Sequence, residues 1–230
     1  MKSQNKDRLR ELQLAYIGRL MAGLSHEFKN HLAIIRELSG LIEDLLVLEE
    51  TEEPKNRERY KKIISGIDER VTLAAEMCRF LSRFSHRMDK PLATFSVTDV
   101  LQEEMYLLHR FARQKQVELV SSFDNDLPVI FNNPSLLQFA VFCIVWPALE
   151  LLEMNSSILI TVHGQGGKVQ IVLHLQGTMK NAENATPWQE MLPEIIPILG
   201  AELSRLTDQE GNRKVVLTLP AIEERQHNIP

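Results

Sequence analysis

Apolar residues in the first part of the chain recur at alternating steps of four and three. Such a heptad seam predicts a long helix over about residues 7–50, which residues 51–54, ending in a proline, should break. A helix of this length cannot bury its apolar stripe alone, so it needs partner helices. The seam consists of Ile17, Met21, Leu24, Phe28, Ile35, Leu38, Ile42 and Leu45, with one slot filled by His31.

A second helical pattern follows the break. Two long helices with a short link form an antiparallel hairpin, and two hairpins side by side form a four-helix bundle. One hairpin alone would leave much apolar surface in water, so the pattern predicts a homodimer. The apolar face of this second helix consists of Ile63, Ile67, Val71, Ala74, Met77, Leu81 and Phe84.

The pattern changes to mixed helices and strands after Pro91. Thr98 is the expected N-cap of a helix to about residue 114, and Asn133 with Pro134 should start an almost wholly apolar helix through Leu152. A further helix around 188–199 is interrupted by prolines. Strands are expected at 95–97, 117–123, 129–131, 158–162, 169–175, 202–207 and 214–219.

These elements predict an α+β protein of two domains. Residues 1–91 would form the helical hairpin, and residues 92–224 an α/β sandwich, a sheet with helices packed on a face. Residues 225–230 would be a tail. Residues 1–93 hold 17 Lys/Arg and 15 Asp/Glu, whereas the remainder holds 9 and 16, so the sandwich is the acidic part.

Composition excludes several classes of protein. The net charge of −5 argues against nucleic acid as a partner, and the absence of an apolar run of 18 residues argues against a membrane span. The polar N-terminus does not resemble a secretory signal, so a cytoplasmic protein is expected. Cys78 and Cys143 lie in apolar helical patterns, where two buried free thiols are expected rather than a disulfide.

The heptad register places His26 at the position farthest from the seam. This imidazole should therefore face water, where it can act as a nucleophile, and Glu27 beside it could orient the ring. Asn30 lies one turn later on the same face. An ordinary surface histidine remains the alternative to a reactive one. His31 occupies the seam itself, where a packed or interface histidine is expected.

The sequence at 25–30, Ser-His-Glu-Phe-Lys-Asn, resembles the H-box of two-component histidine kinases. The hairpin resembles their dimerisation and histidine-phosphotransfer domain, and the order of elements after Pro91 is similar to their catalytic and ATP-binding domain. Leu136 and Gln138 resemble the start of that domain's N-box. The resemblance implies that His26 carries a phosphoryl group, that Glu27 orients or deprotonates it, and that Asn30 places a water.

The chain departs from the family where the family binds nucleotide. The N-box slots that would hold Mg²⁺ and phosphate through asparagines contain Phe142 and Trp146, and aromatic rings offer no hard oxygen ligand. The strand near 173–179 has one glycine and no aspartate, and residues 178–199 contain three prolines and no glycine. No cofactor is therefore expected on this chain.

These observations favour a dimeric histidine phosphotransferase of a phosphorelay. His26 would accept a phosphoryl group from one response-regulator receiver domain and pass it to another, and the receiver would supply its own Mg²⁺. Arg79 and Arg83 are possible receiver contacts, or simply a solvated basic face. Two alternatives remain: a soluble histidine kinase with a divergent ATP site, and a non-catalytic dimeric scaffold.

Overall fold

The structure is a computed structural model of the 230-residue chain, and it describes residues 2–48, 54–180, 186–207 and 213–221. The chain divides into two compact units, which are considered separately: Arg19–Arg83 forms one, and Met1–Gly18 together with Phe84–Pro230 forms the other. Of the predicted break at 51–54, residues 51–53 lie outside the described residues and Pro54 begins the second helix; the predicted tail at 225–230 also lies outside them.

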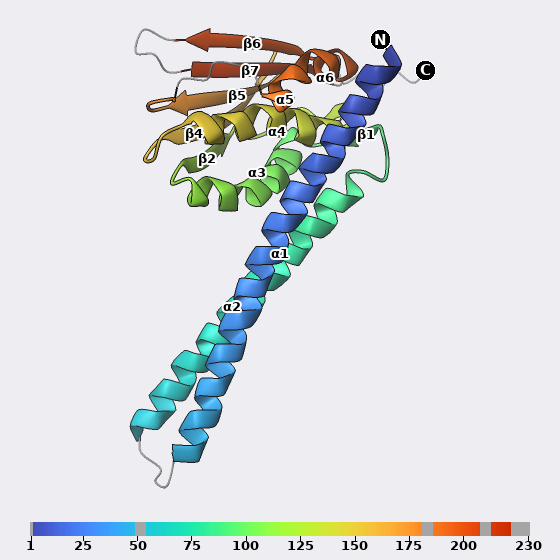
Figure 1. Cartoon of the computed structure of the whole chain (residues 1–230). Helices are drawn as coiled ribbons and strands as arrows, with labels where there is room; N and C mark the ends of the chain where they lie inside the picture. Colours follow the sequence, from blue (N-terminus) through green and yellow to red (C-terminus); the bar gives the residue numbers. More distant parts are fainter. Residues whose placement is uncertain (1, 49–53, 181–185, 208–212, 222–230) are drawn as a thin grey trace. The chain divides into compact units, whose positions relative to one another are not determined.

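Two long helices form the predicted hairpin (Figure 1): α1, Lys2–Leu48, and α2, Pro54–His86. The seam is confirmed at most positions, with Leu24, Ile63 and Met77 buried. The exceptions are Met21 and Val71, which are exposed. Gly66 of α2 lies so close to Leu38 of α1 that a Cβ atom there would be only 3.1 Å from the leucine side chain, so the small residue permits close packing.

The second unit contains a five-stranded mixed sheet in the order β2-β4-β5-β7-β6 and a separate antiparallel pair, β1-β3. The strand pair β2–β4 is parallel, and the other pairs of the sheet are antiparallel. Helices α3 and α4 cover one face of the sheet (Figure 1). The expected α+β class is confirmed. The bounds are β1 Ala93–Phe95, α3 Val97–Gln114, β2 Glu118–Phe123, β3 Ile130–Asn132, α4 Pro134–Leu151, β4 Ser157–Gln165, β5 Lys168–Gln176, α5 Pro187–Glu190, α6 Leu192–Ile198, β6 Glu202–Thr207 and β7 Arg213–Pro220.

Local capping explains where the two covering helices begin. Asn133 caps α4 as predicted, because its side chain accepts a hydrogen bond from the backbone N–H of Leu136. The predicted cap of α3 was wrong by two residues. Ser96 accepts from the backbone N–H of Asp99, while the hydroxyl of Thr98 pairs with that of Ser96.

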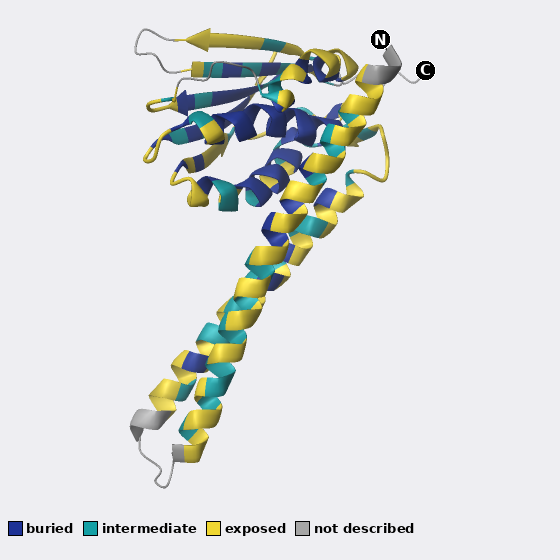
Figure 2. Cartoon of the chain, in the orientation of Figure 1, coloured by how far each residue is buried: buried dark blue, intermediate teal, exposed yellow. Residues whose placement is uncertain are grey.

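Helix α4 forms the centre of this unit's core, and Figure 2 shows it buried along nearly its whole length. By length and composition it could cross a membrane, but 83% of the helix is buried inside the unit, as expected of a core helix. The predicted absence of a membrane span stays a prediction. Cys143 lies within α4 and is buried, whereas Cys78 is exposed, so the prediction of two buried thiols was wrong for Cys78; both cysteines are free.

Candidate functional site

The imidazole of His26 lies on the exposed side of α1, as its register predicted. Asn30, one turn later, is also exposed, and its amide nitrogen lies 3.3 Å from Nδ1 of His26. Glu27 is half-buried beside them. The three predicted site residues therefore lie together on one helix, and the histidine and the amide are in contact.

His31 differs from His26, as the heptad predicted. Its side chain is half-buried, and its Nδ1 atom is buried without a hydrogen-bond partner among the described residues. A buried ring nitrogen cannot be reached by another protein, so His31 suits a packed seam position rather than a nucleophile. Leaving this nitrogen without a hydrogen bond costs free energy.

In the sheet-containing unit, the face of α4 with the N-box-like slots is packed with aromatic rings. Phe142 is fully buried and stacks on Trp146 at 5.3 Å between ring centroids. Its ring also lies 4.6 Å from that of Tyr16 in α1 and 5.0 Å from that of Trp188 in α5. These rings occupy the side of α4 on which the resemblance would place a metal and phosphates.

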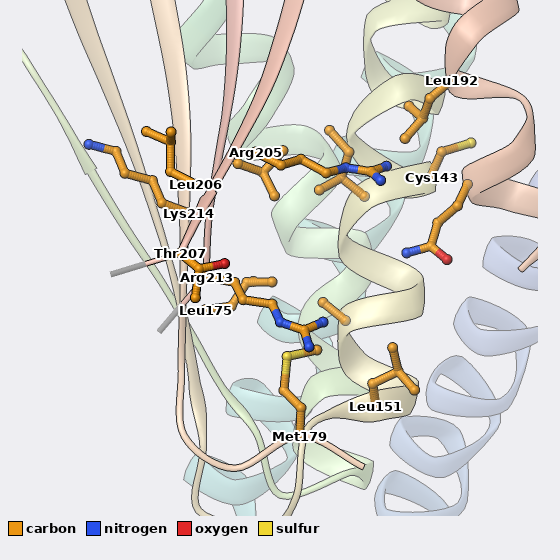
Figure 3. Close-up of a pocket in the computed structure, with 14 residues that line it drawn as sticks. Cys143, Leu151, Leu175, Met179, Leu192, Arg205, Leu206, Thr207, Arg213 and Lys214 are labelled. Carbon is orange, nitrogen blue, oxygen red and sulfur yellow. The ribbon is translucent and has the colours of Figure 1, made fainter. Parts of the chain in front are cut away.

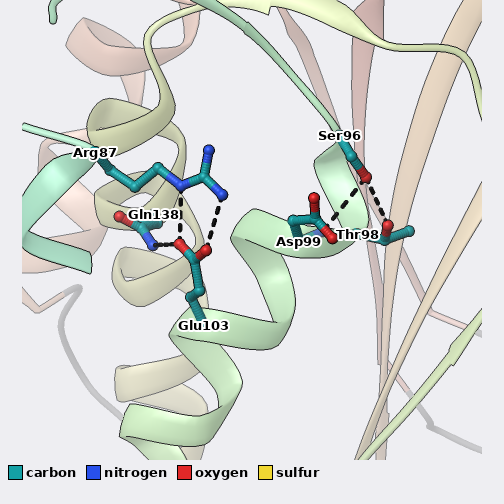
Figure 4. A network of polar contacts seen from close by, with 6 residues as sticks. All are labelled: Arg87, Ser96, Thr98, Asp99, Glu103 and Gln138. Carbon is teal, nitrogen blue, oxygen red and sulfur yellow. Dashed lines mark hydrogen bonds and ion pairs between the residues drawn. The ribbon is translucent and has the colours of Figure 1, made fainter. Parts of the chain in front are cut away.

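The third N-box-like residue, Gln138, takes part in a buried polar network (Figure 4). Arg87 donates two hydrogen bonds to Glu103, at 2.9 and 2.8 Å, and the carboxylate of Glu103 is almost completely buried. The amide of Gln138 donates to the same carboxylate at 3.4 Å. The amide nitrogen of Gln138 is therefore engaged within the protein, whereas its oxygen is buried without a partner among the described residues. A bidentate guanidinium compensates the buried charge of Glu103.

The neighbouring carboxyl group, Glu104, forms no ion pair with a described residue. The hydroxyl of Tyr16 donates a 2.5 Å hydrogen bond to one of its oxygens, and the other oxygen is buried without a partner in the described part of the chain. The pKa of Glu104 is raised to about 8, mainly by burial and to a smaller extent by the charge of Glu103, against the lowering effect of the Tyr16 hydrogen bond. Burial and the adjacent Glu104 likewise raise the pKa of Tyr16 well above its ordinary value.

Sequence reasoning missed this network. Glu103 and Glu104 lie in the first half of α3, where acidic residues favour the helix dipole without any distant partner. The signal that could have identified them is their position on the wheel of α3, within the arc of Val100, Leu101, Leu107 and Leu108, all buried. Acidic residues inside an apolar arc predict buried partners.

A pocket of about 280 Å³ lies on another side of α4 (Figure 3), between that helix, the ends of β5, β6 and β7, and the α5–α6 segment. None of the N-box-like residues Gln138, Phe142 and Trp146 lines it. Its α4 wall is apolar, and the guanidinium groups of Arg205 and Arg213 point into it from the strands (Figure 3).

The residues present do not fit a magnesium nucleotide at the N-box-like slots. Both slots hold rings inside the aromatic core, and Gln138, at the start of the N-box-like segment, donates its amide N–H to Glu103. Among the described residues, no three His, Cys, Asp or Glu side chains gather in a way that could hold a metal ion. A divalent cation and a triphosphate both require groups that this face of α4 does not offer.

Comparisons with known proteins were made on sequence and on structure. No family model matches the chain. Over 146 residues, 64% of this chain, it is 26% identical to the signal transduction histidine-protein kinase AtoS of Escherichia coli (strain K12), and the match spans 22% of the length of AtoS.

Solved structures share the fold at low identity. The catalytic domain of the histidine kinase ThkA, in a nucleotide-free form, superposes on 57% of this chain and 98% of its own, with a TM-score of 0.51 and 14% identity. Full-length ShkA in complex with AMPPNP covers 86% of this chain and 46% of its own, with a TM-score of 0.50 and 14% identity. The AtoS match and the shared fold together support a histidine-kinase-like protein with an α/β lobe built like that family's catalytic domain.

Proposed function

We propose that this chain is a histidine phosphotransferase of a two-component phosphorelay, with His26 as the phosphoacceptor. The observation that carries the proposal is the contrast between an exposed His26 and the aromatic core at the N-box-like slots. A phosphotransferase needs an accessible nucleophile and no nucleotide of its own. The phosphoryl donor and acceptor would be receiver domains, which bring their own Mg²⁺.

The chemistry requires little from this chain beyond position. Nε2 of neutral His26 would attack the phosphorus of a receiver aspartyl phosphate; an N–P bond forms, the P–O bond breaks, and the aspartate leaves as a carboxylate. Nε2 can attack only if Nδ1 carries the ring proton. The side-chain oxygen of Asn30 would then have to accept from Nδ1–H, which a rotation of its amide group achieves at the observed spacing. Glu27 would orient the ring or increase its basicity.

A histidine kinase that autophosphorylates His26 is the second candidate. The observation that favours it is the sequence match to AtoS, which is named a histidine-protein kinase. This reading needs a nucleotide site other than the N-box-like face of α4, since the rings there leave no oxygen ligands.

One experiment separates these readings. The protein is incubated with γ-labelled ATP, and separately with a phosphorylated receiver domain. We expect label from the receiver only, no label on His26→Gln, and full label on the control His86→Gln, which changes another exposed histidine. Label from ATP without a receiver would reject the phosphotransferase and establish the kinase. A receiver that binds without any transfer would instead indicate the non-catalytic scaffold.

We also propose that the active form is a homodimer in which two hairpins form a four-helix bundle. Large apolar side chains outside the seam remain exposed on the hairpin, among them Leu32 and Leu41 of α1 and Ile64 of α2. Leu32 and Leu41 border a shallow groove along one face of α1, which suits the packing of another helix. Sedimentation equilibrium should give a dimer, and Leu32→Glu should shift it toward monomer; a wild-type monomer would contradict the proposal. We expect the dimer to act in the cytoplasm and to bind no nucleic acid.

A further inference from the structure

The pocket between α4 and the ends of strands β5–β7 has an apolar wall on one side and two arginine side chains on the other. Its α4 wall is formed by Cys143, Ile144, Ala148 and Leu151, all apolar. Opposite this wall stand Arg205 of β6 and Arg213 of β7 (Figure 3). No carboxylate is among the residues that line it in the described part of the chain.

Strand pairing explains why both arginines point inward. Arg205 pairs with Val215 across β6 and β7, and cross-strand partners project from the same face of a sheet. Val215 is buried, so this is the face that meets α4. Arg213 lies two residues from Val215 and pairs with Leu175 on β5, another buried residue. Both cations therefore lie on the sheet face that meets α4, and both are exposed at the ends of their strands.

From this arrangement we propose that the pocket binds a small organic anion with an apolar body. The carboxylate or phosphate group lies between the guanidinium groups of Arg205 and Arg213, because a guanidinium matches planar, bidentate anions. The apolar body lies against Ile144, Ala148 and Leu151 of α4. Thr207 and Gln189, which also line the pocket, offer a hydroxyl and an amide to a further polar group.

The size of the pocket limits the ligand. At about 280 Å³ it lies just below the range of roughly 300–1,000 Å³ typical of ligand clefts, which favours a compact molecule such as a substituted aromatic or branched acid. Neither His26 nor the N-box-like residues line the pocket, but Met179 and Gln189 belong to segments where the resemblance implies nucleotide contacts. The proposed ligand is a compact acid rather than a magnesium nucleotide, and its failure to bind would leave the proposed function of His26 untouched.

Thermal shift on the full chain tests the proposal, because a ligand that binds the folded state raises the Tm. The probes are benzoate and phenyl phosphate; benzamide, which lacks the charge, and inorganic phosphate, which lacks the apolar body, are the controls. We expect benzoate or phenyl phosphate to raise the Tm and both controls to leave it unchanged. No shift with either probe, or an equal shift with benzamide or inorganic phosphate, would overturn the proposal.

Substitutions locate the binding. Arg205→Gln and Arg213→Gln should each weaken binding by about tenfold or more, since each removes a charged hydrogen-bond donor, and the double variant should abolish the shift. Lys214→Gln is the matched control: Lys214 also borders the pocket on the same strand, but its ammonium group points away from α4 (Figure 3). A shift retained by the double variant, or lost equally in Lys214→Gln, would reject the site.

A measurement on the wild type covers the case in which the double variant does not fold. Titration with the effective probe should move the side-chain Nε–H NMR signals of Arg205 and Arg213, and leave in place that of Arg83, which belongs to the other unit. Unchanged signals for the two pocket arginines would show that the anion binds elsewhere and would refute the proposal.

Discussion

The face of α1 around His26 and the face of α4 around Phe142 are the two places where the resemblance to histidine kinases implies chemistry. On α1 the residues are polar, exposed and in hydrogen-bond contact. On α4 the corresponding slots are rings packed against Tyr16 and Trp188. The same resemblance thus marks one surface that a partner protein can reach and one that forms part of a hydrophobic core.

The difference shows that the same fold can hold either a binding face or a core face at this side of α4. A helix face that binds a metal ion must present accessible oxygen atoms, whereas a face in the core is stabilised by each aromatic ring that it buries. In this chain, rings from α1 and α5 cover this face of α4. Their packing stabilises the fold, whereas an open nucleotide site would leave the face in contact with water.

Truncating Phe142 should break the aromatic side of the comparison. Phe142→Ala removes a fully buried ring that touches Tyr16, Trp146 and Trp188, so the free energy of unfolding should fall by about 3–5 kcal/mol. Urea unfolding measures the loss. Phe131→Ala is the control, at a ring that is 57% exposed, and it should cost less than about 1 kcal/mol. Similar costs for the two variants would mean that the rings do not form a packed core.

The buried ion pair allows a second test of the same core. Arg87→Gln leaves the Glu103 carboxylate buried without its cation, which should cost about 2–4 kcal/mol in urea unfolding. Replacing both residues by methionine should cost clearly less than the single change. Arg79→Gln, at an exposed ion pair on α2, should cost less than about 1 kcal/mol. A double variant as unstable as the single one would show that the ion pair is not what matters.

Glu104 should make stability depend on pH. Its pKa is raised to about 8 in the folded protein from the model-peptide value of 4.5, so the folded state holds a proton that the unfolded state has lost between these values. Stability is therefore full below this window and falls as the pH rises through it. Since one pKa unit corresponds to about 1.4 kcal/mol, Glu104→Gln should be stabilised over the wild type by roughly 3 kcal/mol at neutral pH.

The measurement is urea unfolding of both proteins at several pH values. The difference between the Glu104→Gln variant and the wild type should shrink toward acid pH and grow until about pH 8. Tyr16→Phe is the companion variant, since it keeps the ring but removes the hydroxyl that bonds Glu104. A difference that does not change with pH would show that Glu104 titrates normally.

Asn30→Ala should have the smallest effect of these variants, and it tests the role of the exposed face around His26. We expect transfer to His26 to persist and hydrolysis of the phosphohistidine to slow by about tenfold, the effect of losing one positioned polar group. The lifetime of the label after removal of the receiver measures this. Asn5→Ala, at an exposed amide elsewhere on α1, is the control. Unchanged hydrolysis would leave Asn30 as an orienting residue only.

Periodicity foretold the elements of this molecule because each depends on neighbours a few residues away. The seam from Leu24 to Leu45 and the cap at Asn133 are local signals, and both predicted structures formed. The exposure of His26 followed from the same register. Cys78 was misplaced because a heptad seen in isolation does not fix which flank of the helix another element covers.

The parts that sequence did not predict all depend on distant partners. Tyr16 and Glu104 are 88 residues apart, and nothing near either residue indicates the other. Nothing near Arg205 or Arg213 in the sequence indicates a pocket; strand pairing places them, both exposed, on the sheet face that meets α4. The roles proposed for His26, Glu27 and Asn30, like the domain limits at 91 and 224, stay predictions.

The contribution of Tyr16 and Arg87 bears on how the sheet-containing unit can be isolated. A fragment that starts at residue 92 would lack the hydroxyl that bonds Glu104, the guanidinium that neutralises Glu103 and one ring of the aromatic cluster. The fragment would contain a buried carboxylate without its cation and an apolar cavity in its core. A fragment of this unit should therefore start at Phe84 and include residues 1–18, either attached or supplied as a separate peptide.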